Sequence, residues 1–273
     1  MPTVKDHAVA LFRRVKGVGL SLQAAAVSYN AFLALVPLII ALLGVAALIG
    51  QSAEAITRVE RALAPVAPDS VVDFIIDLMR DAGQRVGDSG GLLVIVSAVV
   101  ALYLGSRAVV ALQRAIAVVD HQWEARKGVS IRLVAIALTI AGGLALLVTS
   151  ALLVAGRELF EFLANLTGID ALAGLWAWLR LPVAALGLYA FLLAFYHFGP
   201  PHPLPRTWMA ALVATGGALV GSLGFGLYLA ISPDLGPTFG TLGVVAIALV
   251  WLYMGALAIL FGAVVATYAR DQG

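Results

Sequence analysis

Two neighbouring polar side chains, Tyr29 and Asn30, lie inside a long apolar segment near the start of the chain. Polar groups in hydrocarbon need hydrogen-bond partners, so we expect both side chains to point into a helix bundle. Pro37 follows in the same segment, and proline tends to kink a helix because it removes a backbone hydrogen bond. The pair therefore either bonds to a neighbouring helix or lines a cavity opened at the kink, where it would contact a substrate.

Two arginines, Arg107 and Arg114, are seven residues apart and so share one face of a predicted helix. Guanidinium groups at a membrane edge bind lipid phosphate through paired hydrogen bonds. They also act as anchors that fix the position of a helix in the membrane. Both interpretations stand for these two residues and for Arg206, and Arg107 and Arg114 are candidate substrate-binding residues.

Metal and cofactor chemistry has little support in the sequence. The chain has four histidines and no cysteine, and only His197 and His202 are close together, with no carboxylate near them. A metal site needs three or four converging ligands, so we predict no metal. No Walker-type phosphate loop occurs, and we predict no cofactor.

The composition is that of an integral membrane protein. Of the 273 residues, 62% are hydrophobic and only 12% are charged, whereas soluble domains carry about 25% charged residues. The net charge of +2 is too small to indicate a nucleic-acid partner. We therefore predict membrane lipids as partners and no nucleic acid.

Six apolar segments are long enough to cross a bilayer as helices, which takes about 20 residues each. We predict an all-α, polytopic fold in which a six-helix transmembrane domain covers residues 20–273. The centres of the spans contain no Asp, Glu, Lys or Arg, which disfavours a pump driven by protons or sodium. The predicted spans are residues 22–49, 91–112, 131–155, 173–198, 207–231 and 241–267.

Two polar regions are expected to lie outside the spans. Residues 1–19 combine basic residues with apolar residues at helical spacing, which predicts an amphipathic helix on the membrane surface. Residues 51–89 form a long helical loop in which Asp69, Asp73, Asp77 and Asp81 recur every four residues. That acidic row is either a solvated helix face or a surface for cations and polar head groups.

The distribution of Lys and Arg predicts the orientation. An even number of spans places both termini on one side, and the segments of that side carry most of the basic residues. The positive-inside rule then puts both termini in the cytoplasm and the loop 51–89 outside, with the protein in the bacterial inner membrane.

Small residues at four-residue spacing predict close helix packing, because they let helix backbones approach in a membrane. Gly217 and Gly221 form such a pair, and Ala258, Gly262 and Ala266 form a nearly smooth face. We assign structural roles to Gly217, Gly221, Gly240, Gly262 and Pro37.

Short motifs along most of the chain resemble, in order and spacing, those of the YihY/BrkB family of bacterial inner-membrane proteins. They are Ala24-Ala25 through Tyr29, Pro37-Leu38, Tyr196-His197-Phe198-Gly199-Pro200, Pro205-Arg206, Trp208, Gly217-Ala218, Thr238-Phe239-Gly240, Gly243, Trp251-Leu252-Tyr253 and Gly262-Ala263. From these motifs, His197, Thr238 and Phe239 join the candidate substrate-binding residues. Val264 stands where the family commonly has a glutamate.

The resemblance implies six transmembrane helices and a role in the cell envelope, and some family members have been linked to lipid transport. We predict a transporter or flippase-like protein that handles a lipid or another amphiphile. The alternative is a non-transporting scaffold that assembles envelope proteins and has a protein partner. We predict no enzymatic activity, because the ribonuclease label once attached to the family needs a metal-binding cluster of His, Asp and Glu that the sequence does not show.

Overall fold

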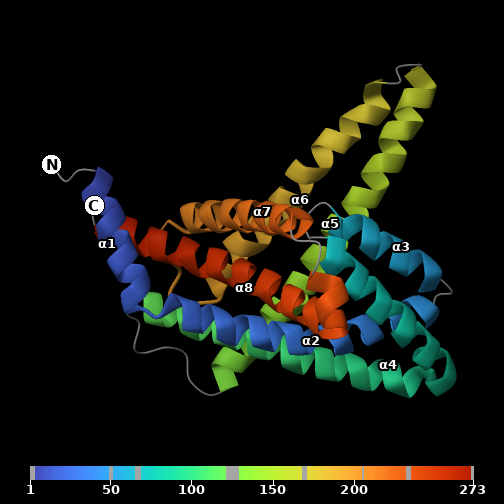
Figure 1. Ribbon diagram of the computed structural model, residues 1–273, viewed down its shortest axis with the longest axis horizontal. Coiled ribbons are helices and arrows are strands. Elements are labelled where there is room, and N and C mark those ends of the chain that lie inside the picture. Colours follow the sequence, from blue (N-terminus) through green and yellow to red (C-terminus); the bar gives the residue numbers. More distant parts are fainter. Residues whose placement is uncertain are drawn as a thin grey trace.

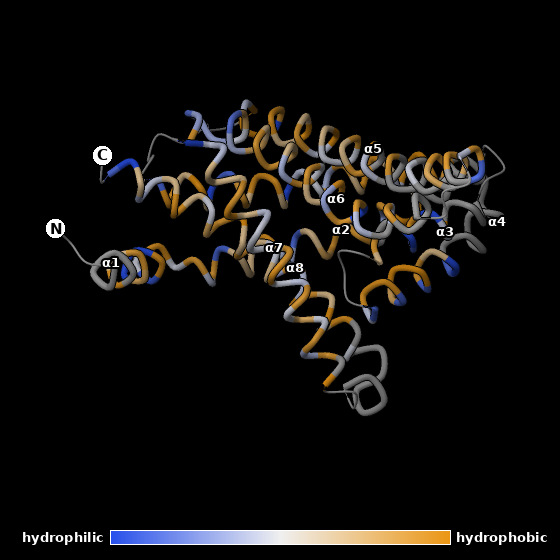
Figure 2. The backbone as a smooth tube through the Cα atoms, turned by 90° about the horizontal axis from the view of Figure 1, so that it is seen from above, coloured by the Kyte–Doolittle hydropathy of each residue, from blue (hydrophilic) through white to orange (hydrophobic). Residues whose placement is uncertain are grey.

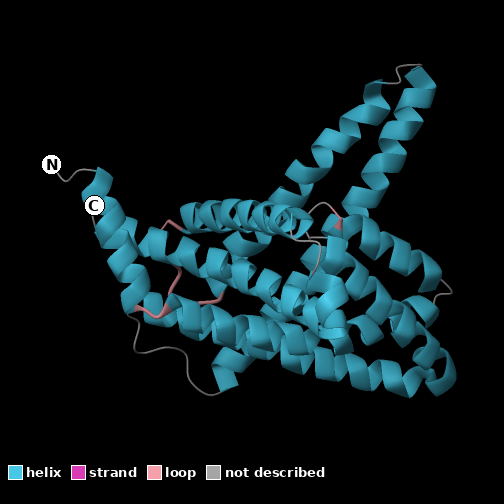
Figure 3. Cartoon of the chain, in the orientation of Figure 1, coloured by secondary structure: helices cyan, strands magenta, loops and turns pink. Residues whose placement is uncertain are grey.

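The chain folds into helices throughout the part that the structure describes (Figures 1 and 3). The computed structural model describes residues 4–48, 52–64, 69–120, 129–167, 171–204, 206–231 and 235–271, and no strand occurs among them. The prediction of an all-α protein is confirmed. The helices are α1 (Val4–Gly17), α2 (Leu20–Leu48), α3 (Ser52–Leu63), α4 (Asp69–Val119), α5 (Val129–Thr167), α6 (Ala171–Phe198), α7 (Thr207–Ile231) and α8 (Leu235–Asp271).

Six of the described helices are long and apolar enough to cross a membrane, which confirms the predicted number. Each of them contains at least 18 consecutive residues of high mean hydropathy with no more than two charged side chains. The crossing segments are Leu20–Ala41, Val94–Val119, Val129–Leu146, Trp178–Phe198, Thr207–Leu229 and Val245–Asp271.

The helices α2, α4, α7 and α8 form the main bundle, and α1 crosses one end of it beside both chain termini (Figure 1). Helices α5 and α6 pair with each other and lean away from this bundle (Figure 1). Hydrophilic residues gather at the terminal end and along α3, as Figure 2 shows. The short helix α3 lies at the end opposite the termini.

Helix α4 contains 51 residues and consists of two arms that run in different directions (Figure 1). We call residues 69–81 the first arm and residues 92–119 the second arm. The segment between them carries glycine at positions 83, 87, 90 and 91, and glycine is a common site of helix bending. The first arm packs on α3 and the far end of the bundle, and the second arm lies along α2.

Three element boundaries differ from the sequence-based expectation. Helix α4 begins at Asp69, inside the region 51–89 that was expected to be a separate helical loop, and continues without a break into the second span. Helix α5 extends to Thr167, through a region expected to be a connection. Helix α8 begins at Leu235, before the expected start of the last span at 241, so residues 237–240 belong to its first turns. Proline is tolerated there because the first helical N–H groups have no partner within the helix.

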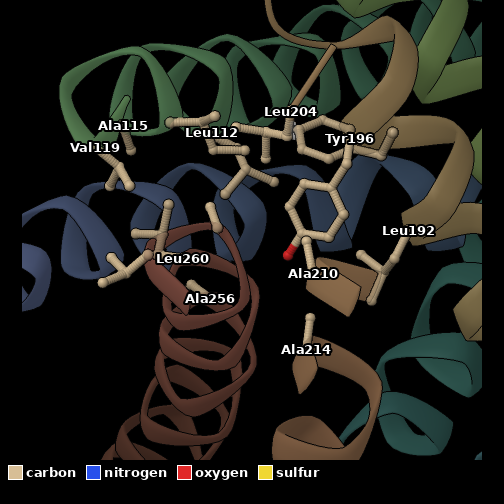
Figure 4. Close-up of a cluster of buried hydrophobic side chains, with 14 of the residues drawn as sticks. Leu112, Ala115, Val119, Leu192, Tyr196, Leu204, Ala210, Ala214, Ala256 and Leu260 are labelled. Carbon is tan, nitrogen blue, oxygen red and sulfur yellow. The ribbon is translucent and has the colours of Figure 1, made fainter. Parts of the chain in front are cut away.

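The largest buried cluster lies near the terminal end of the bundle, where α2, α4, α6, α7 and α8 meet (Figure 4). Its centre is Tyr196, which is fully buried and whose hydroxyl donates to the carbonyl of Ile259 across 2.5 Å. Gly262 lies directly beside it: a Cβ there would come within 2.5 Å of the Ala210 carbonyl oxygen and 3.0 Å of the Tyr196 hydroxyl. A glycine on α8 therefore allows α6, α7 and α8 to converge at this point.

Candidate functional site: a basic stripe on α4 and α5

Four side chains form a basic stripe along the second arm of α4 and the start of α5: Tyr103, Arg107, Arg114 and Arg132. Residues four and seven apart on a helix share one face, which aligns Tyr103, Arg107 and Arg114. Arg132 reaches over from α5, with its Cζ 4.5 Å from the centre of the Tyr103 ring. Val110 packs on Ile131 and so fixes α5 beside the stripe.

The guanidinium groups of Arg107 and Arg114 are open to the outside of the bundle, because both side chains are exposed. Among the residues that the structure describes, no carboxylate forms an ion pair with either of them. At 1.5 Å per residue their Cα atoms are about 10 Å apart along the helix. Two unpaired guanidinium groups beside an apolar surface are suited to an anionic head group.

The turn between α6 and α7 marks the level of the stripe along the bundle. Gln113, next to Arg114, is buried and donates from Nε2 to the carbonyl of Gly199 across 3.0 Å. Arg206 starts α7 with a φ of 52°, and its carbonyl accepts from the N–H groups of Met209 and Ala210. Its side chain is exposed, so Arg114 and Arg206 lie at one end of the apolar part of the bundle.

A second polar group lies beyond this level and joins three helices. Arg270 on α8 pairs with Asp120 at 2.8 Å and with Asp271 at 3.1 Å. Asp271 in turn pairs with Arg14 on α1 at 2.6 Å. The Asp120 side chain is only 2% exposed, so the end of α4 and the end of α8 are joined by a largely buried carboxylate. We call Arg14, Asp120, Arg270 and Asp271 the terminal network.

Of the first pair of predicted site residues, Tyr29 does not point into the bundle, and the expectation is corrected for Tyr29. Tyr29 is 57% exposed and lies on the outer surface of α2. Asn30 donates from Nδ2 to the carbonyl of Ala26 on its own helix. This bond satisfies the Asn30 amide within its own helix, so Asn30 does not require a hydrogen-bond partner on a neighbouring helix. Pro37 lies within the continuous helix α2.

The remaining predicted residues are spread over the molecule. His197 is exposed at the end of α6, and its ring meets that of Phe198 edge-on at 4.7 Å. The backbone of Thr238, Phe239 and Gly240 belongs to α8, but their side chains lie outside the described residues. The structure therefore does not bring His197, Tyr29 and Arg107 together in one described contact.

The glycines assigned to packing lie where α7 meets α8. A Cβ on Gly217 would stand 3.2 Å from the Cβ of Ala258, and one on Gly221 would stand 3.5 Å from Met254. Gly262, with the closest approach of the three, is described above. Val264, at the position where the family commonly has glutamate, is fully buried in the same cluster.

Sequence reasoning missed several polar contacts. Gln113 and Asp120 lie beyond the expected end of the second span at residue 112, yet both are buried. Tyr103 and Arg132 are 29 residues apart, and only the antiparallel pairing of α4 and α5 brings them together. The motif that contains Tyr196 was a usable signal, because it marks the turn against which Gln113 bonds.

No group of three His, Cys, Asp or Glu residues that could hold a metal occurs within the described ranges. His121 lies outside those ranges, as does the side chain of His7.

Comparisons with known proteins cover nearly the whole chain. The family described as "Virulence factor BrkB" matches residues 11–273. The Bacillus subtilis (strain 168) protein named "Putative ribonuclease-like protein YfkH" is 27% identical over 243 residues, which is 88% of this chain and 86% of that protein. No solved structure matches the chain. Since the family match extends over nearly all of a chain with six membrane-spanning helices, this multi-pass membrane protein belongs to the virulence factor BrkB (YihY) family.

Proposed function

We propose that the protein moves an amphiphile with an anionic head group, such as a phospholipid, between or along the leaflets of the membrane. The observation that carries the proposal is the basic stripe, with two exposed guanidinium groups that lack a described carboxylate partner. The stripe lies on the outer surface of a membrane-spanning helix, where a lipid head group can reach it without entering the bundle.

The surroundings of the stripe fit an amphiphile better than a small ion. Exposed apolar side chains continue along the second arm beyond Tyr103, among them Ile95, Val96 and Val99. Acyl chains can cover these residues while the phosphate stays at the arginines, since guanidinium groups bind phosphate oxygens in pairs. Tyr29, also on the outer surface, adds a hydroxyl at membrane depth on the neighbouring helix α2.

The scaffold alternative is favoured by a different observation. Asn30 is satisfied within its own helix and Tyr29 faces outward, so this pair does not build a polar path through the interior. A scaffold would use the outer surface to bind protein rather than lipid. It predicts a stable protein partner and no lipid movement.

The proposal is tested by reconstituting the purified protein in liposomes with labelled anionic and zwitterionic lipids. We expect faster exchange between leaflets than in empty liposomes. The double variant Arg107→Gln/Arg114→Gln should lose at least about tenfold in rate, because a hydrogen bond to a charged group contributes about 1.5–3 kcal/mol. The matched control is Arg180→Gln, an exposed arginine near the other end of the α6 span, which should keep the rate.

Three outcomes would count against the proposal. Exchange no faster than in empty liposomes, across all head groups, would favour the scaffold, as would a protein that co-purifies in stoichiometric amount. Cleavage of RNA by the same preparation, with or without divalent metal, would instead support the activity in the printed name of the Bacillus subtilis relative.

A further inference from the structure

We infer that α3 and the first arm of α4 form a re-entrant hairpin that carries an acidic, water-covered face into the membrane. The inference is independent of the proposed function. It rests on where the hairpin contacts the membrane-spanning helices and on which of its side chains remain exposed.

The first arm reaches well inside the bundle. The rings of Phe74 on this arm and Phe32 on α2 stack with centroids 6.3 Å apart and planes 7° apart. Phe32 belongs to the span Leu20–Ala41. It lies nine residues before the end of that span, or about 13 Å along the helix. The arm therefore does not lie on the membrane surface beyond the ends of the spans.

A buried cluster holds the arm in this place. Five apolar residues of the arm are at most 6% exposed, and they pack with Ile39, Phe225 and Ile247, which belong to the spans of α2, α7 and α8. The partly buried residues of α3 join the same cluster, so α3 and the arm enter together. The five residues are Val71, Val72, Ile75, Ile76 and Met79.

The fold of α4 requires this return into the bundle. Phe74 touches Phe32, whereas Leu112 of the second arm shares a buried cluster with Val27. Along a straight helix, positions 74 and 112 would be about 57 Å apart, whereas positions 27 and 32 are about 8 Å apart. Both placements are possible because the axis of α4 turns back between its two arms, as Figure 1 shows.

The opposite face of the hairpin is charged. Asp69, Asp73, Asp77 and Asp81 are all exposed, and Asp77 pairs with Arg80 at 3.0 Å although both side chains stay more than 60% exposed. Exposed charges on α3 continue this face; they are Arg58, Glu60 and Arg61. Charged side chains at membrane depth face a water-filled cavity or a partner rather than acyl chains. Water entering from the end opposite the termini is therefore the medium that covers this face.

The absence of cysteine from the chain makes the test direct, because single cysteines can be placed without background. In sealed proteoliposomes, Asp73→Cys should react with a membrane-impermeant trimethylammonium thiol reagent within about tenfold of its rate in denatured protein, because water reaches it. Val99→Cys, on the apolar exposed surface of the second arm, should react at least about a hundredfold more slowly, because lipid covers it. The impermeant reagent reaches only the outside of the vesicles, so the protein should be inserted in both orientations. Tags on the termini then show which side of the protein carries the reactive cysteine.

The depth of the hairpin is measured separately with nitroxide labels on the double variant Asp73→Cys/Val99→Cys. A straight α4 would hold these positions about 39 Å apart along its axis, and a returned arm brings them clearly closer. Both sites are exposed, so labelling leaves the core intact. Reaction at position 73 together with a short distance supports the inference. A distance near that of a straight helix, or a residue 73 as unreactive as residue 99, overturns it.

Discussion

The hydroxyl of Tyr196 and the missing side chain of Gly262 together set the closest approach of three helices. The hydroxyl donates to a carbonyl of α8 in the middle of an apolar cluster, where an unpaired polar group would be costly. The bond can form because position 262, three residues further along α8, presents no Cβ to the Tyr196 oxygen or to the Ala210 carbonyl. The two residues therefore depend on each other.

Gly262→Ala should destabilise the protein by about 1–3 kcal/mol, because the added methyl group would overlap backbone that cannot move aside without separating α7 from α8. The measurement is the thermal unfolding midpoint of the purified protein in detergent. Gly255→Ala is the matched control on the same helix, since a Cβ there meets nothing within 4 Å. Helix propensity alone would raise the midpoint of both variants, because alanine favours a helix over glycine by about 1 kcal/mol. A midpoint for Gly262→Ala as high as that for Gly255→Ala would therefore show that this contact does not limit stability.

For single residues, the sequence predicts the packing positions of small residues better than the direction in which polar side chains point. The spacing of Gly217, Gly221 and Gly262 indicated packing, and all three lie where α7 meets α8. Tyr29 and Asn30 were expected to point inward because both are polar, but Tyr29 is exposed and Asn30 bonds to the carbonyl of Ala26 on its own helix. A residue pattern shows which groups need partners, but it does not show whether the partner is one turn away or on another helix.

Helix α1 is attached to the bundle both by apolar side chains and by an ion pair. Leu11 and Val15 pack against the bundle, while Val9 and Phe12 are about half exposed or more. The Nζ of Lys16 lies 4.8 Å from the centre of the Phe12 ring. Exposed apolar and basic groups together are suited to an anionic leaflet. The ion pair between Arg14 and Asp271 then fixes which face of α1 is turned to the bundle.

Reversing one charge of this pair should loosen α1. In Arg14→Glu, the new carboxylate would repel Asp271 and compete with it for Arg270. Loss of the ion pair should weaken the docking of α1 by about 1 kcal/mol, the usual value for a partly exposed pair. The docked fraction of α1 is read from the distance between labels on α1 and α8. Combining Arg14→Glu with Asp271→Arg should recover most of the docking, and failure to recover it would show that the apolar contacts alone hold α1.

The number of membrane spans could be predicted from the length of the apolar segments, but the course of helix α4 could not. Six apolar segments give six spans because hydrocarbon thickness sets their length, independently of tertiary contacts. The course of α4 could not be derived in this way. The glycines at 83, 87, 90 and 91 allow a bend, but its direction depends on the contact of Phe74 with Phe32, between distant parts of the sequence.

Across the whole molecule, the charge distribution separates two ends. The terminal network and the basic stripe lie toward the end where the termini meet, and the acidic face of the first arm lies toward the other (Figures 1 and 2). An amphiphile with an anionic head group would be attracted to the stripe and repelled by the acidic face. The head-group contact of the proposed function therefore belongs to the end of the molecule that carries the termini.

The same asymmetry predicts the orientation of the chain, with both termini in the cytoplasm. The ion pair at 2.6 Å between Arg14 and Asp271 requires the two ends of the chain to share one side, and the excess of Lys and Arg in the segments of that side selects the cytoplasm. Reporter fusions at each terminus, one active only in the cytoplasm and one only outside it, measure this directly. A fusion at Glu60, within α3, is the internal control and should give the opposite signal.

If the termini reported opposite sides, the ion pair could not form and an odd number of crossings would be required. If both lay outside, the basic stripe would face the outer leaflet, and the head-group contacts proposed for Arg107 and Arg114 would have to be made there.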